Sequence, residues 1–364
     1  MIELEGHKIG GDAPCFIIGE AGINHDGDLE KAKEMVKVAK DAGCDAVKFQ
    51  LITAERLYIK DAGSFTTDFG EDFNIFDVWK NVELTKEWLP QLKQACEENN
   101  IIFMSSVFDE VGADVIEEFI GIYKIASYEL THLPLLKHVA SKGKPIIMSI
   151  GGSTGLKQIR EAIETVKSAG NNQIIIMQCV AQYPAKLENT NVNVLDTLRK
   201  EFPEVIIGFS DHSMDPEKVP GAAVAKGAKL VEKHFTISRE SQGIDHKMSI
   251  EPEELKRMVT TIKETEARMK RGEAIEIDPI LLGTGEIALA DDQKDLMKFT
   301  RRRVFVKTNI ITGEEITADK LTILRPGNRH VETGLPAKDI DTVIGKKAVK
   351  DLAEGHMIGI MDFE

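Results

Sequence analysis

The stretch FIIGEAGINHDGDLEKAKEMVKVAKDAGCDAVKFQ, residues 16–50, contains one complete strand–helix–strand unit. Its apolar runs Phe16–Gly19 and Ala46–Phe49 are short and almost uncharged, as strands are when both faces of a parallel sheet are covered. Between them, Leu29–Ala42 repeats apolar residues at helical spacing. Asp28 stands directly before this segment and is a typical N-cap residue. The unit predicts two parallel strands joined by a helix.

The same alternation occurs eight times along the chain. The other strand candidates are Ile101–Met104, Ile122–Ile125, Pro145–Met148, Gln173–Met177, Val205–Gly208 and Lys229–Glu232. Helical spacing recurs near Lys86–Asn99, Val111–Phe119, Leu133–Ala140, Thr154–Ala169, Asn193–Lys200, Pro216–Lys226 and Pro252–Lys270. Gly143, Gly170 and Gly227 follow three of these helices, where a left-handed C-cap is expected. Eight such units predict a (β/α)₈ TIM barrel, with an open doubly wound sheet as the alternative.

The segments around the barrel pattern predict additional parts. Met1–Ile9 has the pattern of a short extra strand or hairpin, and Tyr58–Lys80 is long enough to be a lid or binding loop. We therefore predict a catalytic barrel domain over residues 1–270, a linker over 271–298 and a small β-rich domain over 299–364.

Composition narrows the class of protein. The net charge of −14 and the pI of about 5.3 argue against nucleic-acid or anionic-membrane partners. The four cysteines form no Cys-x-x-Cys pair, and a reducing cytoplasm is the simplest compartment for them. The start MIELEGHKIG lacks a signal-peptide pattern, and no apolar run approaches the roughly 18 residues of a membrane span.

Polar residues follow almost every predicted strand. In chain order they are Glu20, then Lys48 and Gln50, Ser105 and Ser106, Lys124, Ser127 and Glu129, Ser149, Gln178, Ser210, Asp211 and His212, and finally Lys233 and His234. In a barrel the carboxyl ends of all strands meet at one mouth, where the chemistry of this fold takes place. The pattern predicts an active site at that mouth.

Two lysines and two histidines in this set suggest particular ligands. Lys48 and Lys124 lie inside apolar strands, where a lysine needs an anionic partner. That partner is either a carboxylate such as Glu20 or, as we prefer, a phosphate or carboxylate of a ligand. His212 and His234 end neighbouring strands and suit a divalent ion whose shell substrate oxygens complete.

Several segments resemble one known family. They are GEAGINHDGDLEKAKEMVKVAKDAGCDAVKFQ, YKIASYE, MQCVAQYPA, GFSDHS, VEKHFT and GIDHKMSIEPEEL, in this order. Together they are similar to the sialic acid (N-acetylneuraminate) synthases. The tail segments RRRVFVK and LRPGN resemble the C-terminal antifreeze-like (SAF) domain of that family.

The resemblance implies a reaction and a set of site residues. Phosphoenolpyruvate would condense with N-acetylmannosamine or a related amino sugar and release phosphate, with Mn²⁺, or alternatively Mg²⁺ or Co²⁺, on His212 and His234. The implied contacts to phosphoenolpyruvate are Lys48, Ser105, Lys124, Ser127, Ser149 and Ser210, and those to the sugar are Gln50, Tyr183, Asp245 and Arg325. Glu20 and Glu129 would lie near the reacting atoms, and either would carry the proton. The family also implies a domain-swapped homodimer, in which the SAF domain of one subunit covers the other's barrel mouth.

The exact activity stays open at this point. The segments RPGNRHVETGLP and MSIGG depart from the family pattern. The sugar substrate is therefore either N-acetylmannosamine or a related sugar that leads to legionaminic or pseudaminic acid. A Schiff-base aldolase or lyase would instead use Lys124 as its nucleophile. A non-catalytic sugar-binding protein is the third possibility.

Overall fold

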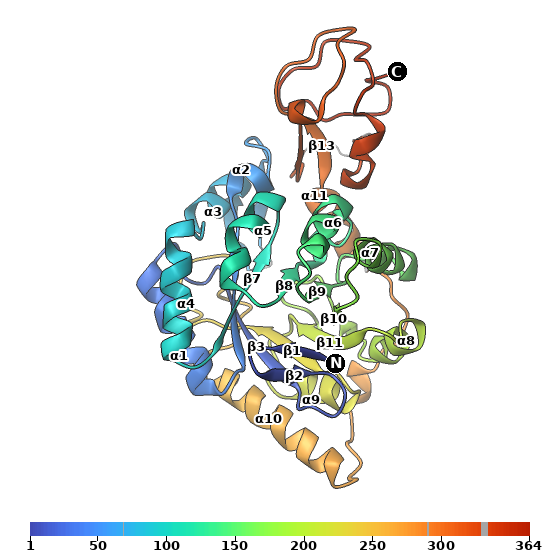
Figure 1. Ribbon diagram of the computed structural model, residues 1–364. Coiled ribbons are helices and arrows are strands. Elements are labelled where there is room, and N and C mark those ends of the chain that lie inside the picture. Colours follow the sequence, from blue (N-terminus) through green and yellow to red (C-terminus); the bar gives the residue numbers. More distant parts are fainter. Residues whose placement is uncertain (68, 290, 329–333) are drawn as a thin grey trace.

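The chain folds around a closed barrel of parallel strands (Figure 1). The computed structural model describes residues 1–67, 69–289, 291–328 and 334–364, without the side chains of residues 291 and 292. The barrel strands are β3 (Phe16–Gly22), β4 (Ala46–Leu51), β7 (Ile102–Val107), β8 (Tyr123–Ile125), β9 (Ile146–Ser149), β10 (Ile174–Cys179), β11 (Ile206–Asp211) and β12 (Leu230–His234). They pair in chain order, and β12 closes the ring on β3. The predicted TIM barrel is confirmed, and the open sheet is excluded.

At least one α-helix follows each barrel strand, and one helix per strand covers the outside of the barrel. These helices are α1 (Leu29–Ala42), α4 (Leu89–Glu98), α5 (Glu110–Ile116), α6 (Leu133–Ser141), α7 (Leu156–Ser168), α8 (Val194–Glu201), α9 (Lys218–Ala225) and α10 (Pro252–Lys270). Asp28 caps α1 by accepting hydrogen bonds from the backbone of Glu30 and Lys31, as predicted. Gly43 ends α1 with a φ of 90°, a left-handed conformation that favours glycine.

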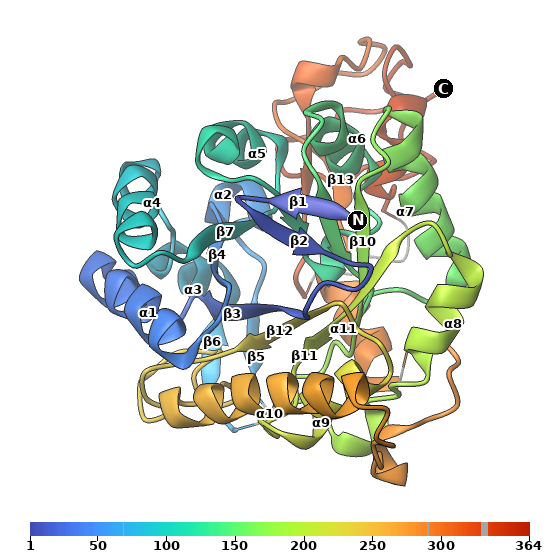
Figure 2. The same ribbon diagram turned by 60° about the horizontal axis from the view of Figure 1, so that its bottom comes forward.

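The barrel is closed at one end and open at the other. The hairpin of β1 (Ile2–Leu4) and β2 (His7–Ile9) lies across the amino ends of the strands (Figure 2). Its apolar side chains pack against residues of the barrel interior such as Ile18 and Met177. Only the carboxyl ends of the strands are therefore left to form a site.

The insertion after β4 and the tail meet at this open end. The insertion contains α2 (Ala54–Leu57), β5 (Ser64–Thr66), β6 (Asp72–Asn74) and α3 (Ile75–Asn81), and the tail contains β13 (Arg303–Val306) and β14 (Leu321–Leu324). Tyr58 and Arg325 form a backbone bridge between the two parts. An apolar cluster that includes Leu57, Phe108 and Phe305 joins the insertion, the barrel and the tail.

The remaining elements are short. They are η1 (Lys86–Trp88), η2 (Glu117–Phe119), η3 (Ser127–Glu129), η4 (Leu187–Asn189), η5 (Pro279–Leu281), η6 (Ala318–Lys320), η7 (Ala337–Thr342) and α11 (Asp291–Thr300). Both η5 and α11 fall in the segment predicted to be a linker, and α11 continues past residue 298. Across the described residues, no helix combines the length and the apolar character of a membrane span.

Candidate active site

Two lysines and two glutamates meet inside the open end of the barrel. The Lys48 ammonium lies 2.6 Å from Glu20 Oε2 and 3.5 Å from Glu232 Oε1. The Lys124 ammonium lies 2.6 Å from Glu232 Oε2. All four side chains are almost completely shielded from solvent. Both lysines are therefore paired with carboxylates, which was the less favoured of our two expectations.

Burial and pairing shift the pKa values of these groups in different directions. Burial raises the pKa of Glu20, although the nearby Lys48 opposes the shift. Burial would also raise the pKa of Glu232, but Lys124 and Lys48 outweigh it and lower this pKa to about 2. The pKa of Lys124 is lowered because its burial outweighs the attraction of Glu232. Glu232 is thus a fixed anion, whereas Glu20 is better suited to hold a proton.

The alternation of side chains along the strands decides which residues enter this cluster. On β4, Ala46, Lys48 and Gln50 face inward, and Gln50 donates a 2.9 Å hydrogen bond to Glu20 Oε1. On β12, Glu232 lies two residues before His234, so both face the interior. Glu232 was missed from the sequence, although this two-residue spacing was a signal for it. It also accepts a 3.2 Å hydrogen bond from Ser210.

The same alternation corrects one predicted contact. Met104 faces the barrel interior, so Ser106 faces it as well and Ser105 points to the outer side. Ser106 accepts a 3.1 Å hydrogen bond from Lys48, whereas the Ser105 hydroxyl donates to the Ser106 carbonyl. Ser106 therefore takes the place in the cluster that the sequence analysis gave to Ser105.

His212 and His234 lie side by side next to this cluster, with ring centroids 5.4 Å apart. His212 Nδ1 lies 2.8 Å from the Val180 carbonyl, and its Nε2 lies 3.9 Å from the Cys179 sulfur. His234 Nδ1 is buried without a hydrogen-bond partner, and burial together with His212 keeps its pKa well below the ordinary value. A neutral buried imidazole with an unpartnered nitrogen fits a divalent metal ion.

The two imidazoles alone do not complete a metal shell. Among the described residues, no group of three or more His, Cys, Asp or Glu side chains is arranged to hold an ion. A carboxylate beside them is that of Asp245, whose Oδ2 lies 3.7 Å from His234 Nδ1. An ion on the histidines would therefore need oxygen ligands from substrate or water.

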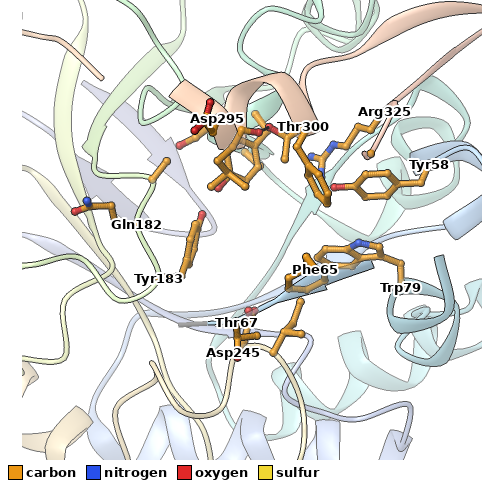
Figure 3. A pocket seen from close by; sticks show the side chains of 18 of the residues that line it. Tyr58, Phe65, Thr67, Trp79, Gln182, Tyr183, Asp245, Asp295, Thr300 and Arg325 are labelled. Carbon is orange, nitrogen blue, oxygen red and sulfur yellow. Dashed lines mark hydrogen bonds between the residues drawn. The ribbon is translucent and has the colours of Figure 1, made fainter. Parts of the chain in front are cut away.

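A cavity of about 810 Å³ opens above this cluster (Figure 3). Gln50, Ser127, Tyr183, His234, Asp245 and Arg325 line it, and all were predicted as site residues. Its other wall is aromatic and comes from the insertion, the tail and the residue after β7, with Tyr58, Phe65, Phe69, Trp79, Phe108 and Phe299. Tyr183 also packs on His212, with ring centroids 4.4 Å apart. The cavity thus reaches the two histidines and is large enough to hold a sugar.

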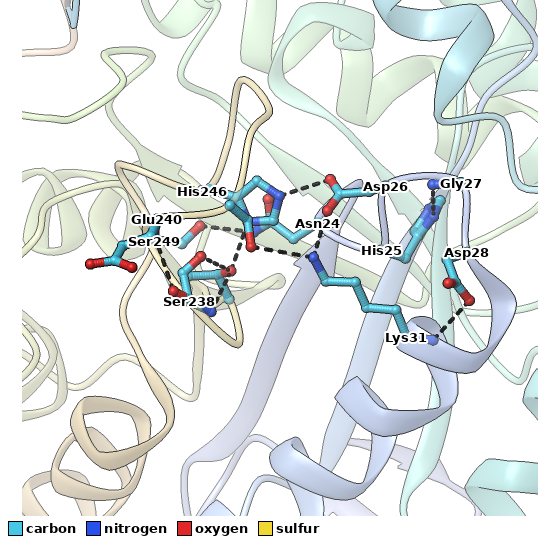
Figure 4. Close-up of polar contacts among 12 residues, drawn as sticks. Asn24, His25, Asp26, Gly27, Asp28, Lys31, Ser238, Glu240, His246 and Ser249 are labelled. Atoms are coloured by element: carbon cyan, nitrogen blue, oxygen red, sulfur yellow. Dashed lines mark hydrogen bonds and ion pairs between the residues drawn. The ribbon is translucent and has the colours of Figure 1, made fainter.

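The loop that carries Asp245 is fixed by polar contacts to the loop after β3 (Figure 4). The buried His246 lies 2.8 Å from Asp26 Oδ1 through Nε2 and 2.7 Å from Thr236 Oγ1 through Nδ1. The Ser249 hydroxyl donates a 2.5 Å hydrogen bond to the Asp245 carbonyl. These contacts hold Asp245 at the cavity wall, where burial and Glu20 raise its pKa to about 7.

Glu129 lies in a different environment from the one predicted for it. Its carboxylate is fully buried and lies 2.9 Å from Arg302 Nε and 2.6 Å from Arg325 Nη2, both from the tail. Burial would raise its pKa, but the two guanidinium groups hold it far below the ordinary value. A carboxylate paired in this way is poorly suited to carry a proton, and we now expect Glu129 to anchor the tail.

Arg302 lies in the segment RRRVFVK, but its place among three successive arginines gave no sign that it enters the site. It also donates hydrogen bonds to the carbonyls of Arg56, Ile323 and Phe108 at 2.6, 3.1 and 2.6 Å. Of the remaining predicted residues, the Ser127 hydroxyl accepts a 3.1 Å hydrogen bond from the Gly151 backbone. The Ser149 hydroxyl is buried without a partner, as a group that awaits a ligand would be.

Known proteins share both parts of this architecture. A model described as the NeuB family matches residues 35–274, and a SAF domain model matches residues 301–364. The spore coat polysaccharide biosynthesis protein SpsE of Bacillus subtilis is 42% identical, covering 96% of this chain and 94% of that protein. Its crystal structure has a TM-score of 0.88 at 40% identity, covering 100% of this chain and 99% of that one.

Two further relatives are named for their reactions. The N,N'-diacetyllegionaminic acid synthase of Legionella pneumophila is 34% identical, covering 95% of this chain and 94% of that protein. The N-acetylneuraminate-9-phosphate synthase of Homo sapiens is 30% identical, covering 98% of this chain and 96% of that protein. Relatives over the full length therefore include synthases named for different acids.

Proposed function

Since this chain belongs to the NeuB family, we propose that it is an enzyme that joins phosphoenolpyruvate to a 2-acetamido sugar. Its C-terminal part matches the SAF domain. Water is the third substrate, and the products are a sialic-acid-type nonulosonate and phosphate. The observation that carries the proposal is the buried Lys48 and Lys124 beside the two imidazoles, at the base of a sugar-sized cavity.

The lysines supply the binding site for phosphoenolpyruvate in this proposal. The ligand brings a carboxylate and a phosphate, and charge-assisted hydrogen bonds to buried ammonium groups are strong. Glu20 would release Lys48 by taking up a proton, in line with its raised pKa. Ser106, Ser149 and Ser210 would add hydroxyl donors around the phosphate.

His212 and His234 are the residues that would hold the metal ion. When bound, such an ion supplies Lewis-acid polarisation of the sugar aldehyde. Tyr183 and Asp245, which contact the two imidazoles, would orient the sugar beside them. The aromatic wall excludes water from the reacting atoms.

The reaction then proceeds by formation of one carbon–carbon bond. The enol π electrons of phosphoenolpyruvate attack the aldehyde carbon from C3, and the aldehyde oxygen takes up a proton. Water adds to C2 and loses a proton, and the C2–O bond breaks to release phosphate and leave a ketone. Of the two glutamates predicted to move the proton, the environment of Glu20 supports this role, since Glu129 is paired with two arginines.

A second candidate differs only in the sugar. The aromatic wall with Phe65, Trp79 and Phe299 favours a less polar substrate, because burying a hydroxyl without a partner is costly. A 2,4-diacetamido-2,4,6-trideoxyhexose has a methyl group where N-acetylmannosamine has a hydroxymethyl group. It leads to a legionaminic or pseudaminic acid, and one full-length relative is named as a legionaminic acid synthase.

The decisive experiment is phosphate release from phosphoenolpyruvate with a panel of 2-acetamido and diacetamido sugars, with and without a chelator. We expect release with at least one sugar, its loss on chelation and its return with Mn²⁺, Mg²⁺ or Co²⁺. Release that ignores chelation would contradict the metal assignment. No release with any sugar would contradict the synthase assignment.

Two further measurements separate the rival chemistries. Oxygen from labelled water should appear in the sugar acid, and label in phosphate would exclude C–O cleavage. A Schiff-base lyase would use Lys124, whose lowered pKa suits a nucleophile, and borohydride with a keto acid would then trap the protein covalently. We expect no trapping.

We also propose a cytoplasmic homodimer. Domain swapping exchanges identical elements between subunits, so the contacts of Arg302 and Arg325 with Glu129 could form between two chains as well as within one. The four cysteines are free and buried, which suits a reducing compartment.

A further inference from the structure

A buried ion pair lies directly behind the two histidines, and the proposed reaction gives it no role. Lys233 Nζ lies 2.5 Å from Asp211 Oδ2, and the side chains are only 1% and 2% exposed. Asp211 immediately precedes His212, and Lys233 immediately precedes His234. The two residues are also direct partners in the register of β11 and β12, where they form the last pair.

The pair faces away from the barrel interior. Side chains alternate along a strand, so Asp211 and Lys233 lie on the same side as Phe209 and Val231. Those two residues belong to the apolar layer between the barrel and its helices. A charged pair is unexpected in this layer, because replacing such a pair by well-packed apolar residues often leaves stability unchanged or improved.

The contacts of Lys233 enclose the backbone on both sides of His212. Besides Asp211, its ammonium donates to the Ser213 carbonyl at 2.6 Å and to the Ser213 hydroxyl at 3.3 Å. Asp211 Oδ1 in turn accepts a 2.8 Å hydrogen bond from the Ser213 backbone. The residues before and after His212 are thus both tied to the residue before His234.

We propose that the Asp211–Lys233 pair positions the metal site by holding His212 and His234 at the separation that one ion requires. This inference rests on the proposed metal role of the two histidines. His212 stands just past the last pairing of β11, where its backbone carbonyl accepts a 2.9 Å hydrogen bond from the Ala185 backbone. The ion pair adds a tie toward His234, because it joins the residues on both sides of His212 to the residue before His234. Outer groups that orient metal ligands in this way typically contribute 10–100-fold to metal affinity.

The test compares the stability and the metal affinity of the same variants. Asp211→Asn leaves the Lys233 charge without a carboxylate, and we expect both the melting temperature of the metal-free protein and the Mn²⁺ affinity to fall. The double variant Asp211→Val with Lys233→Met removes both charges. We expect it to regain stability while its Mn²⁺ affinity, measured by the EPR signal of free Mn²⁺, stays about 10–100-fold below wild type. A folded double variant with wild-type affinity would overturn the inference.

Two more variants complete the design. Lys233→Arg keeps a cation in the fold but presents a planar fork in place of a point charge, so it should fold and bind Mn²⁺ more weakly. Wild-type affinity in this variant would also count against the inference. The control double variant Asp114→Val with Lys142→Met removes an ion pair of 2.6 Å between α5 and the residue after α6, and its Mn²⁺ affinity should be unchanged.

The failure of this inference can be told apart from failure of the proposed function. Equal Mn²⁺ affinity in wild type and His212→Ala would show that His212 binds no metal ion. The proposed metal site and the positioning role would then both be wrong. A wild type that binds Mn²⁺ through His212, together with an unaffected double variant, would overturn the positioning role alone.

Discussion

Replacing Glu129 by Gln tests whether this buried carboxylate anchors the tail or moves a proton. The substitution keeps the shape but removes the charge that faces Arg302 and Arg325 at 2.9 and 2.6 Å. Leaving buried charges unpaired costs about 3–5 kcal/mol. Since 1.4 kcal/mol is a factor of ten, the docked position of the tail should be disfavoured by roughly a hundredfold or more.

The expected result is a split between kinetic parameters. Because Arg325 lines the cavity from the tail, the KM for the sugar should rise while the KM for phosphoenolpyruvate changes little. The melting temperature should fall, and proteases should cleave the chain more readily between residues 271 and 298. Glu110→Gln is a control, since this partly exposed carboxylate lies 3.7 Å from His132 and forms no ion pair with an arginine among the described residues.

The opposite pattern would refute this reasoning. If Glu129 carried the proton, Glu129→Gln would lower kcat by about 10²–10⁴-fold and leave the sugar KM and the melting temperature unchanged. We expect that loss of kcat for Glu20→Gln instead, together with a lower melting temperature, because the buried Lys48 loses the carboxylate 2.6 Å from it.

Three further substitutions probe other parts of the site. His212→Ala should abolish turnover and leave the circular dichroism spectrum unchanged, because it removes one of two metal ligands; full retained activity would exclude the metal role. Arg325→Ala should raise the KM for the sugar more than that for phosphoenolpyruvate, and an unchanged sugar KM would contradict the role of the tail. His246→Ala should also raise the sugar KM, because it frees the loop of Asp245 from Asp26, whereas Lys338→Ala at an exposed ion pair should not. Equal sugar KM values in the last two variants would show that the loop needs no such support.

Local sequence signals gave the barrel because each element depends on near neighbours. The first helix is fixed by its apolar spacing, the Asp28 cap and the left-handed Gly43, all within one short segment. The strands were visible as apolar runs, and polar residues at their ends marked the mouth. The predicted ends were approximate, since the eighth strand was expected to stop at Glu232 and continues to His234.

Three-dimensional packing decided how the site residues are paired. The sequence by itself determined the barrel, the family and most of the side chains at the mouth, because periodicity and motifs are properties of the chain order. Only the tertiary structure placed Ser106 in place of Ser105, added Glu232 to the lysines and paired Glu129 with Arg302 from 173 residues away. The physical reason is that an ion pair depends on distance and burial in space, and neither is encoded in the separation of two residues along the chain.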